Sequence, residues 1–272
     1  MGGATAATLF SAMGVDGRHM EWVAFVFGLC IGSFLNVCIY RLPLSKSIVH
    51  PRSACPNCGH PIRACDNVPV ASYLLLRGRC RDCGVRIPVR YPLVELLSGA
   101  FAAMTVLKFG IGWQGLLMYG VIAALLVITF IDIDHRIIPD LITLPGIPIG
   151  VAASFGLTQV SPLESLIGVL AGGGSLYLVA WGYQLITKRD GMGGGDIKLL
   201  AMIGAFFGWQ GVLFTVFVAS LSGTLAGMAL ILRSHGNMKL AVPFGPFLAV
   251  GALGYLFIGP EVIAWYIGWI RH

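Results

Sequence analysis

Two pairs of cysteines have the spacing of metal ligands. Cys55-Pro-Asn-Cys58-Gly and Cys80-Arg-Asp-Cys83-Gly are CxxCG turns separated by 21 residues. Each turn presents two sulfur atoms, and the glycine that follows tolerates the left-handed backbone that such turns need. The spacing predicts a closed four-thiolate site, which is structural rather than catalytic and favours zinc (Zn2+). Two disulfide bonds are the alternative, which a reducing compartment disfavours.

Four aspartates border apolar segments and could do acid–base chemistry. Asp132, Asp134 and Asp140 lie in TFIDIDHRIIPDLIT, and Asp196 follows a run of glycines in GMGGGDIKLL. Two carboxylates that share one proton can activate a water molecule and polarise a scissile carbonyl, as in an aspartic protease. The alternative for each aspartate is a helix cap or a solvated junction residue, and this alternative fits Asp140, which directly follows Pro139.

The composition is that of an integral membrane protein. Of the 272 residues, 57% are hydrophobic and 11% are charged, whereas a soluble domain carries about 25% charged residues. We expect an all-α polytopic membrane protein, because apolar runs long enough to cross a bilayer recur along almost the whole chain. This excludes a large soluble catalytic domain. The eight predicted transmembrane helices lie at about residues 21–40, 92–109, 113–131, 141–156, 162–186, 196–208, 210–232 and 243–268.

Local signals mark two of these helices. The first apolar run, residues 22–40, has no basic region before it and no small-residue cleavage site after it. It is therefore expected to be a retained helix rather than a signal peptide. Ser161-Pro-Leu-Glu164 has the form of a capping box and predicts the start of the fifth helix.

The polar, Arg-rich and Cys-rich segment 41–90 divides the chain into three parts. We expect an N-terminal segment with the first helix (1–40), a small four-cysteine zinc-knuckle domain (41–90) and a transmembrane protease domain (91–272). Basic residues favour cytoplasmic loops. With residues 41–90 in the cytoplasm, 15 of the 18 basic residues lie inside and only Arg18, Lys108 and Arg271 lie outside. Both termini are then periplasmic, and the junctions that carry the aspartates are cytoplasmic.

The motifs together resemble those of bacterial type IV prepilin peptidases, which are bifunctional leader peptidases and N-methyltransferases. The resemblance rests on the paired CxxCG turns and on four further segments, spread over most of the chain. These are GSFLNVCIYRLP (32–43), RYPLVELLSG (90–99), IDIDHRIIPDLITLP (131–145) and GGGDIKLLA (193–201).

The resemblance implies which aspartates are catalytic. In this family the second catalytic aspartate closes a GxGD motif, which corresponds here to Asp196. The first precedes a proline by seven residues, which selects Asp132. The spacing also disfavours a pair made of Asp132 and Asp134, because they point to different sides of a helix. Gly193 and Gly195 carry no side chain and would let a substrate strand approach the carboxylate of Asp196.

The resemblance also implies an activity and its substrates. Such an enzyme cleaves the basic leader peptide of prepilins and pseudopilins after a glycine at the cytoplasmic edge of the bacterial inner membrane. It then methylates the new N-terminal amine with S-adenosyl-L-methionine. The chain has no Rossmann-type glycine fingerprint after a strand, and the Cys-rich loop and the region of Glu95 are the candidates for the methyl-donor site.

Two other functions fit the same residues. One is a GxGD-type peptidase without methyltransferase activity. The other is a non-enzymatic membrane assembly or transport protein whose aspartates relay protons or bind cations. The net charge of +6 is concentrated in the segment 41–90, so we expect the lipid bilayer as a partner and no nucleic acid. No sequence feature specifies an oligomeric state.

Overall fold

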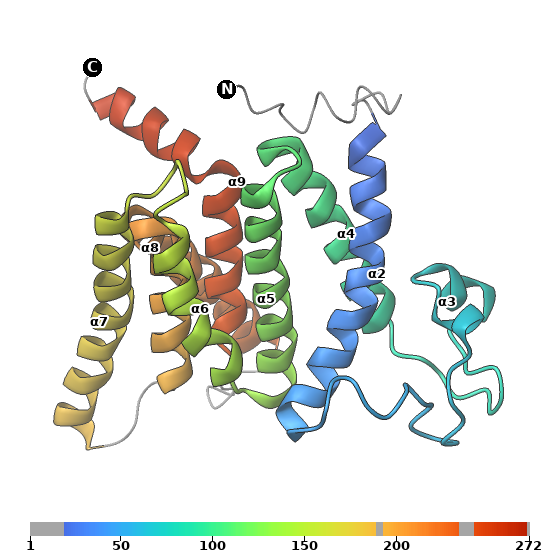
Figure 1. Ribbon diagram of the computed structural model, residues 1–272. Coiled ribbons are helices and arrows are strands. Elements are labelled where there is room, and N and C mark those ends of the chain that lie inside the picture. Colours follow the sequence, from blue (N-terminus) through green and yellow to red (C-terminus); the bar gives the residue numbers. More distant parts are fainter. Residues whose placement is uncertain (1–18, 189–192, 234–241, 271–272) are drawn as a thin grey trace. The chain divides into compact units, whose positions relative to one another are not determined.

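The computed structural model describes residues 19–188, 193–233 and 242–270 (Figure 1). This part of the chain is mainly helical and contains no β-strand, only two isolated β-bridges between α2 and α4. The long helices are α2 (Met20–Arg41), α4 (Arg90–Phe109), α5 (Trp113–His135), α6 (Asp140–Ala153), α7 (Pro162–Thr187), α8 (Gly194–Arg233) and α9 (Gly245–Ile270). Between α2 and α4 lie the short elements η2 (Leu42–Leu44), η3 (Ala64–Asn67) and α3 (Ala71–Leu75).

The predicted all-α membrane architecture is confirmed. In the described residues, 6 helices are long and apolar enough to cross a membrane, namely α2, α4, α5, α7, α8 and α9. Each of the eight predicted segments corresponds to a helix or to part of one. The difference in number arises because α6, with 14 residues, is short for a crossing, and because α8 combines two predicted segments.

Helix α8 is interrupted at Gly208. This residue has φ 67° and ψ −175° and leaves the helical conformation within an element of 40 residues. A bilayer crossing needs only about 20 helical residues. The break separates the segments predicted at 196–208 and 210–232, and only glycine adopts such a backbone conformation readily.

The ends of two other helices bear on the predicted site. Helix α5 continues to His135, beyond the predicted end at residue 131. Asp132 therefore belongs to the last turn of a helix. The predicted capping box at the start of α7 is confirmed, because the Ser161 N–H donates to Glu164 Oε2 at 2.8 Å and the Glu164 N–H donates to Ser161 Oγ at 3.3 Å.

The chain packs as two compact units, and the boundary falls within α5, between Val127 and Ile128. The first unit contains α2, α4, most of α5 and the segment between α2 and α4, which we call the cysteine-rich segment (residues 42–89). The second contains the end of α5 and helices α6 to α9. All four predicted metal ligands therefore lie in the first unit and both predicted catalytic aspartates in the second. The division at residues 40 and 90 stays a prediction.

Small residues bring α2 and α4 together in the first unit. A Cβ atom added to Gly28 would lie 2.6 Å from the Cβ of Ala102, and one added to Gly32 would lie 2.6 Å from the Cα of Glu95. The Ser98 hydroxyl also donates a hydrogen bond to the Gly28 carbonyl at 2.7 Å. Two glycines four residues apart on one helix face thus let the backbones approach, as at many membrane helix interfaces.

The first half of α8 forms the centre of the second unit, in contact with α6, α7 and α9. Its apolar side chains are almost fully buried, including Leu199, Leu200 and Ile203. A Cβ atom on Gly204 would collide with the backbone of Gly168 in α7. The Ser165 hydroxyl donates to the Ala205 carbonyl at 2.7 Å. Close backbone packing therefore fixes the position of the N-terminal half of α8, whose first turn carries Asp196.

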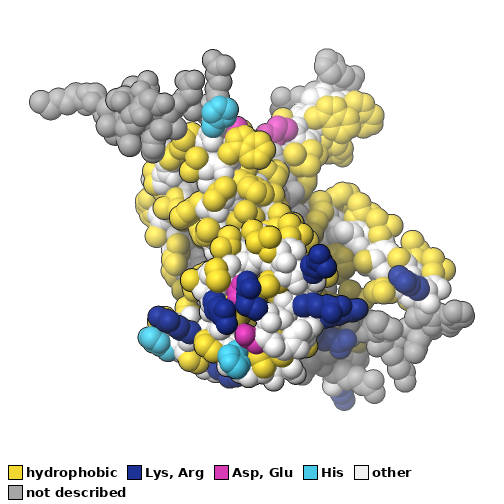
Figure 2. Space-filling model, turned by 90° about the vertical axis from the view of Figure 1, so that its right-hand side faces the viewer, with side chains coloured by type: hydrophobic (Ala, Val, Ile, Leu, Met, Phe, Trp, Pro, Cys, Tyr) yellow, Lys and Arg dark blue, Asp and Glu magenta, His cyan; other side chains and the backbone are white. Residues whose placement is uncertain are grey.

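Lys and Arg side chains gather over the cysteine-rich segment, whereas the helix surface in the same view is mainly hydrophobic (Figure 2). This distribution agrees with a segment that lies outside the hydrocarbon layer of a membrane. Four basic residues that the topology prediction counts lie outside the described residues, namely Arg18, Arg189, Lys239 and Arg271.

Gly28→Ala should destabilise the first unit. The added methyl group would collide with Ala102 and also with the backbone of Gly99 and Ser98, each within 2.8 Å, so the helices must move apart. We expect a loss of about 1–3 kcal/mol in the free energy of unfolding, typical of an overpacked site. Gly120→Ala in α5 is the matched control, because a Cβ there has no neighbour within 4 Å. Equal unfolding midpoints for the two variants in detergent would contradict this packing.

Candidate active site and metal centre

The four cysteines of the two CxxCG turns meet at one point. The sulfur atoms of Cys55, Cys58, Cys80 and Cys83 all lie within 4.8 Å of one another. The glycines that follow the two turns have φ values of 72° and 70° and so adopt the expected left-handed conformation. All four cysteines are free, so the alternative of two disulfide bonds is not formed. The set could hold one metal ion.

Backbone and side-chain donors favour the thiolate form of two of these cysteines. The backbone N–H of Val85 and then the side-chain amide of Asn57 lower the pKa of Cys83 to about 6. The backbone N–H groups of Cys58 and Asn57 lower the pKa of Cys55. Thiolates, not thiols, bind metal ions. The turns therefore supply the ligands and also the donors that orient and stabilise them.

Asp132 is held by the beginning of another helix. Its side chain lies in the last turn of α5 and is 5% exposed. The backbone N–H of Gly245, the first residue of α9, donates to Asp132 Oδ2 at 2.9 Å. A Cβ atom on Gly245 would lie only 2.6 Å from the same oxygen. By contrast, Asp134 is exposed. The two aspartates therefore differ in environment, as their different helix faces predict.

Asp196 joins Asp132 in the same unit. It lies in the first turn of α8 and is partly buried. Ile138, which follows α5 in the chain, lies against the first turns of α8 and α9: its Cβ is 2.9 Å from a Cβ built on Gly195, and its Cδ1 is 3.3 Å from one built on Gly245, whose N–H donates to Asp132. The fold thus brings the ends of α5, α8 and α9 to one point.

Gly193 and Gly195, the two glycines predicted to admit a substrate strand, have different surroundings. The space beside Gly195 is occupied by Ile138 of this chain, so the lack of a side chain there allows this contact. A Cβ on Gly193 would meet only Asp196 Oδ2, at 3.8 Å. Approach of a substrate strand past Gly193 and Gly195 stays a prediction. Gly191 and Met192 of the same motif lie outside the described residues.

Asp140 does not cap α6. The N-cap residue is Pro139, and no side-chain cap hydrogen bond forms. Instead, the Asp140 carboxylate pairs with Lys198, whose Nζ lies 2.8 Å and 2.7 Å from its two oxygens. Asp140 is therefore not a cap, but it agrees with the other expectation, a solvated residue at the helix junction, because its side chain is exposed and pairs with a lysine from α8. The pair joins the first turns of α6 and α8 but is solvent-exposed, and it contributes at most about 1 kcal/mol to stability.

Gly245 is the residue near the aspartates that sequence reasoning missed. The pattern Pro-Phe-Gly-Pro at residues 243–246 marks the start of α9, since proline is favoured in the first turn of a helix. It gives no indication that the free N–H of the glycine meets a carboxylate 113 residues earlier in the chain. Glu95, whose region is a candidate for methyl-donor binding, lies in the first unit and accepts a hydrogen bond from the Val70 N–H at 2.7 Å.

The paired carboxylates can perform acid–base chemistry without a nucleophilic side chain. Two neighbouring negative charges are costly at a partly buried site, so the pair of Asp132 and Asp196 tends to hold one proton between them. The ionised member can accept a proton from water while the protonated member donates a hydrogen bond to a carbonyl oxygen. This arrangement fits the hydrolysis of an amide bond.

Family models match two stretches of the chain. Residues 26–109 match the model described as Bacterial Peptidase A24 N-terminal domain, and residues 119–228 match the model described as Type IV leader peptidase family. The first match contains the four-cysteine cluster, and the second contains both aspartates. No solved structure matches the chain.

Curated relatives extend over nearly the whole chain, and each is named Prepilin leader peptidase/N-methyltransferase. The relative from Burkholderia pseudomallei (strain 1026b) is 39% identical, over 87% of this chain and 84% of its own length. The relative from Aeromonas hydrophila is 37% identical, over 90% and 93%. The relative from Pseudomonas putida is 36% identical, over 94% and 97%.

Cys80→Ser should reduce metal binding to the purified protein well below one ion per chain. The substitution removes one of four converging sulfur ligands, and a site of this kind depends on all of them. Elemental analysis measures the metal content. Cys65→Ser is the matched control, because Cys65 lies in the same segment but outside the cluster. The same metal stoichiometry in Cys80→Ser and wild type would refute the metal centre.

Proposed function

The chain belongs to the type IV leader peptidase family, and on that premise we propose that it cleaves type IV prepilins and pseudopilins and then methylates the product. Cleavage removes the basic leader peptide after a glycine at the cytoplasmic edge of the inner membrane. Methylation modifies the new N-terminal amine. The observation that carries the proposal is that the elements bearing Asp132 and Asp196, 64 residues apart in the sequence, converge around Ile138 and Gly245 in the second unit.

In this mechanism Asp132 is the general base and Asp196 the general acid. The ionised Asp132 carboxylate takes a proton from a water molecule, whose oxygen attacks the carbonyl carbon of the scissile peptide bond. The protonated Asp196 carboxyl donates a hydrogen bond to the carbonyl oxygen, where negative charge develops. As the C–N bond breaks, the departing nitrogen receives a proton from the carboxyl pair and becomes the new N-terminal amine.

The contacts of the two carboxylates support this division of roles. The N–H of Gly245 points at Asp132 Oδ2 from the N-terminus of α9, where the aligned backbone dipoles favour a negative charge. This donor stabilises an ionised Asp132. Its charge in turn disfavours a second charge on Asp196, which therefore keeps the proton that it needs as an acid.

Methylation requires a separate chemical step. S-adenosyl-L-methionine would supply the methyl group, its sulfur keeping the electron pair of the broken C–S bond, and the new amine would give up one proton. The names of the relatives, which include N-methyltransferase, support this second activity.

The cysteine cluster suits Zn2+ in a structural role. Four thiolates leave no open coordination position for a substrate. The cysteine-rich segment contains only short helical elements, so a metal ion would supply folding free energy that its small core lacks.

We further propose that the cysteine-rich segment and the aspartates face the cytoplasm and that both termini are periplasmic. The basic side chains of the cysteine-rich segment support this orientation (Figure 2), because positive loops are retained in the cytoplasm. Lys188 and Lys198, which flank Asp196 in the sequence, support the same side for the proposed catalytic pair.

Asp132→Asn and Asp196→Asn should each slow prepilin cleavage by ~10²–10⁴-fold, the usual contribution of a general acid or base. Processing of a prepilin in membranes that contain each variant measures the rate. Asp134→Asn is the matched control, since its side chain is exposed on the same helix turn, and it should cleave like wild type.

Mass spectrometry of the product separates the three candidate functions. A cleaved and methylated product agrees with the full proposal, and a cleaved product with a free amine leaves only the peptidase. If either Asn variant cleaves at the wild-type rate, the catalytic pair is wrong. Intact processing together with impaired transport or pilus assembly would favour the non-enzymatic alternative.

Gly245→Ala should lower the cleavage rate more than it lowers stability. The new methyl group would lie within 2.6 Å of Asp132 Oδ2, so the carboxylate must leave the position in which it accepts the backbone hydrogen bond. We expect a fall of at least about tenfold in kcat, in line with the loss of one charge-assisted hydrogen bond. Gly268→Ala in the same helix has no neighbour within 4 Å and should have no effect. Equal kcat values for both variants would contradict the positioning role of Gly245.

A further inference from the structure

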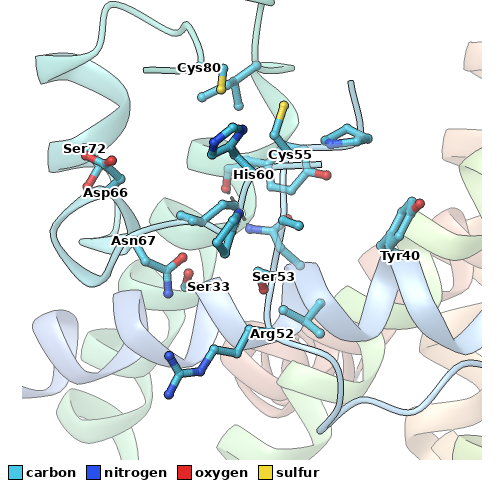
Figure 3. A pocket seen from close by; sticks show the side chains of 18 of the residues that line it. Ser33, Tyr40, Arg52, Ser53, Cys55, His60, Asp66, Asn67, Ser72 and Cys80 are labelled. Carbon is cyan, nitrogen blue, oxygen red and sulfur yellow. Dashed lines mark hydrogen bonds between the residues drawn. The ribbon is translucent and has the colours of Figure 1, made fainter. Parts of the chain in front are cut away.

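The outward face of α3 is apolar, although this short helix lies in a polar segment. Leu74 is 68% exposed and Leu75 is 82% exposed. The opposite face turns inward, where the buried Ser72 hydroxyl donates to the Cys65 carbonyl at 3.0 Å. Figure 3 shows Ser72 in the wall of a cavity of about 840 Å³, between the cysteine-rich segment and the adjoining ends of α2 and α4. A helix on a water-exposed segment normally has polar residues on its outer face, so the two leucines lack an apolar partner.

The contact of Val70 with Glu95 places α3 at the level of the membrane. Val70 directly precedes α3, and its N–H donates to Glu95 Oε2 at 2.7 Å. Helix α4 has 20 residues, about the number that a bilayer crossing needs, so its whole length from Arg90 is required. Glu95 lies about 7.5 Å along the helix axis from Arg90, at roughly 1.5 Å per residue. The beginning of α3 therefore lies at the boundary between lipid headgroups and hydrocarbon.

Basic side chains follow the two leucines in the chain. Arg77 and Arg79 are exposed, and neither has an ion-pair partner in the described part of the chain. A backbone bridge between Arg79 and Arg86 brings a third exposed arginine close to them. Like charges repel one another, so this group favours an anionic partner. An acidic protein would also suit the arginines, but the contact with Glu95 leaves α3 beside the bilayer.

We propose that Leu74, Leu75, Arg77 and Arg79, which we call the α3 patch, dock on the anionic lipid surface of the bilayer that the chain itself spans. The leucine side chains enter the boundary region, and the guanidinium groups bind lipid phosphates. Val70 has φ 58°, which is unfavourable for a β-branched residue. Membrane contact offsets the cost of this conformation, which turns α3 outward. The inference goes beyond the proposed function and depends on neither cleavage nor methylation.

Photo-crosslinking to lipid tests the apolar part of the α3 patch. The full chain is placed in nanodiscs, one chain per disc, that contain phosphatidylglycerol with a diazirine near the start of one acyl chain. Residues 71–79 of wild type should be labelled. The double variant Leu74→Ser/Leu75→Ser should reduce this labelling at least about fivefold relative to that of α4. Val49→Ser is the matched control, because Val49 is 71% exposed in the same segment but outside the patch, and it should leave the labelling unchanged.

Hydrogen exchange tests the basic part of the patch. In wild type, the amides of residues 71–79 should exchange at least about fivefold more slowly in discs with phosphatidylglycerol than in discs of phosphatidylcholine alone. Arg77→Gln/Arg79→Gln should remove most of this difference, and so should high salt, which screens the charges. Metal content and the unfolding temperature report whether each variant is folded. If a variant does not fold, the comparison of the two lipids with wild type still decides.

Three results would overturn the proposal. The first is the absence of label from residues 71–79 in wild type, and the second is equal exchange of these amides in the two lipids. The third is protection that arises only when two chains occupy one disc, which would assign the α3 patch to a second copy of the chain.

Discussion

The hydrogen bond from the Gly245 N–H to Asp132 Oδ2, at 2.9 Å, is the contact on which the proposed active site depends. A carboxylate at the end of an apolar helix is costly to bury unless a donor meets it. The beginning of α9 supplies that donor, since the first N–H groups of any helix lack intrahelical partners. One hydrogen bond thus satisfies both the buried carboxylate and the free N–H group. Residue 245 must be glycine, because a methyl group there would displace the carboxylate of Asp132.

Close helix packing decides whether the second carboxylate reaches the first. Asp196 begins α8, and the backbone of this helix lies against α7 at Gly168 and Gly204, where neither residue has room for a side chain. Gly195 likewise has no room for a side chain, because Ile138 packs against its backbone. Lipid is as apolar as the side chains, so helices in a membrane gain no hydrophobic free energy when they associate. Close van der Waals packing, which small residues allow, holds them together instead. The glycines near Asp196 thus serve the fold as well as the proposed access of a substrate.

Glycines also allow close helix packing in the first unit, between α2 and α4. Gly28 and Gly32 let α2 and α4 approach, and this packing brings Asn36 and Glu95 to the wall of one cavity. The cysteine-rich segment covers that wall through the hydrogen bond from Val70 to Glu95. A metal ion at the four cysteines would fix the fold of the covering segment.

The sequence by itself determined the all-α membrane class, the helix positions and the metal-ligand set, because these follow from local patterns. Apolar runs mark helices, CxxCG turns bring their sulfurs together through their own backbone, and the capping box at Ser161 is complete within four residues. The tertiary structure alone decided the contact of Gly245 with Asp132, the pairing of Lys198 with Asp140 and the unpartnered oxygen of Asn36. Each of these depends on how helices distant in sequence pack, and no local pattern encodes which N–H, ammonium or empty space a polar side chain will meet.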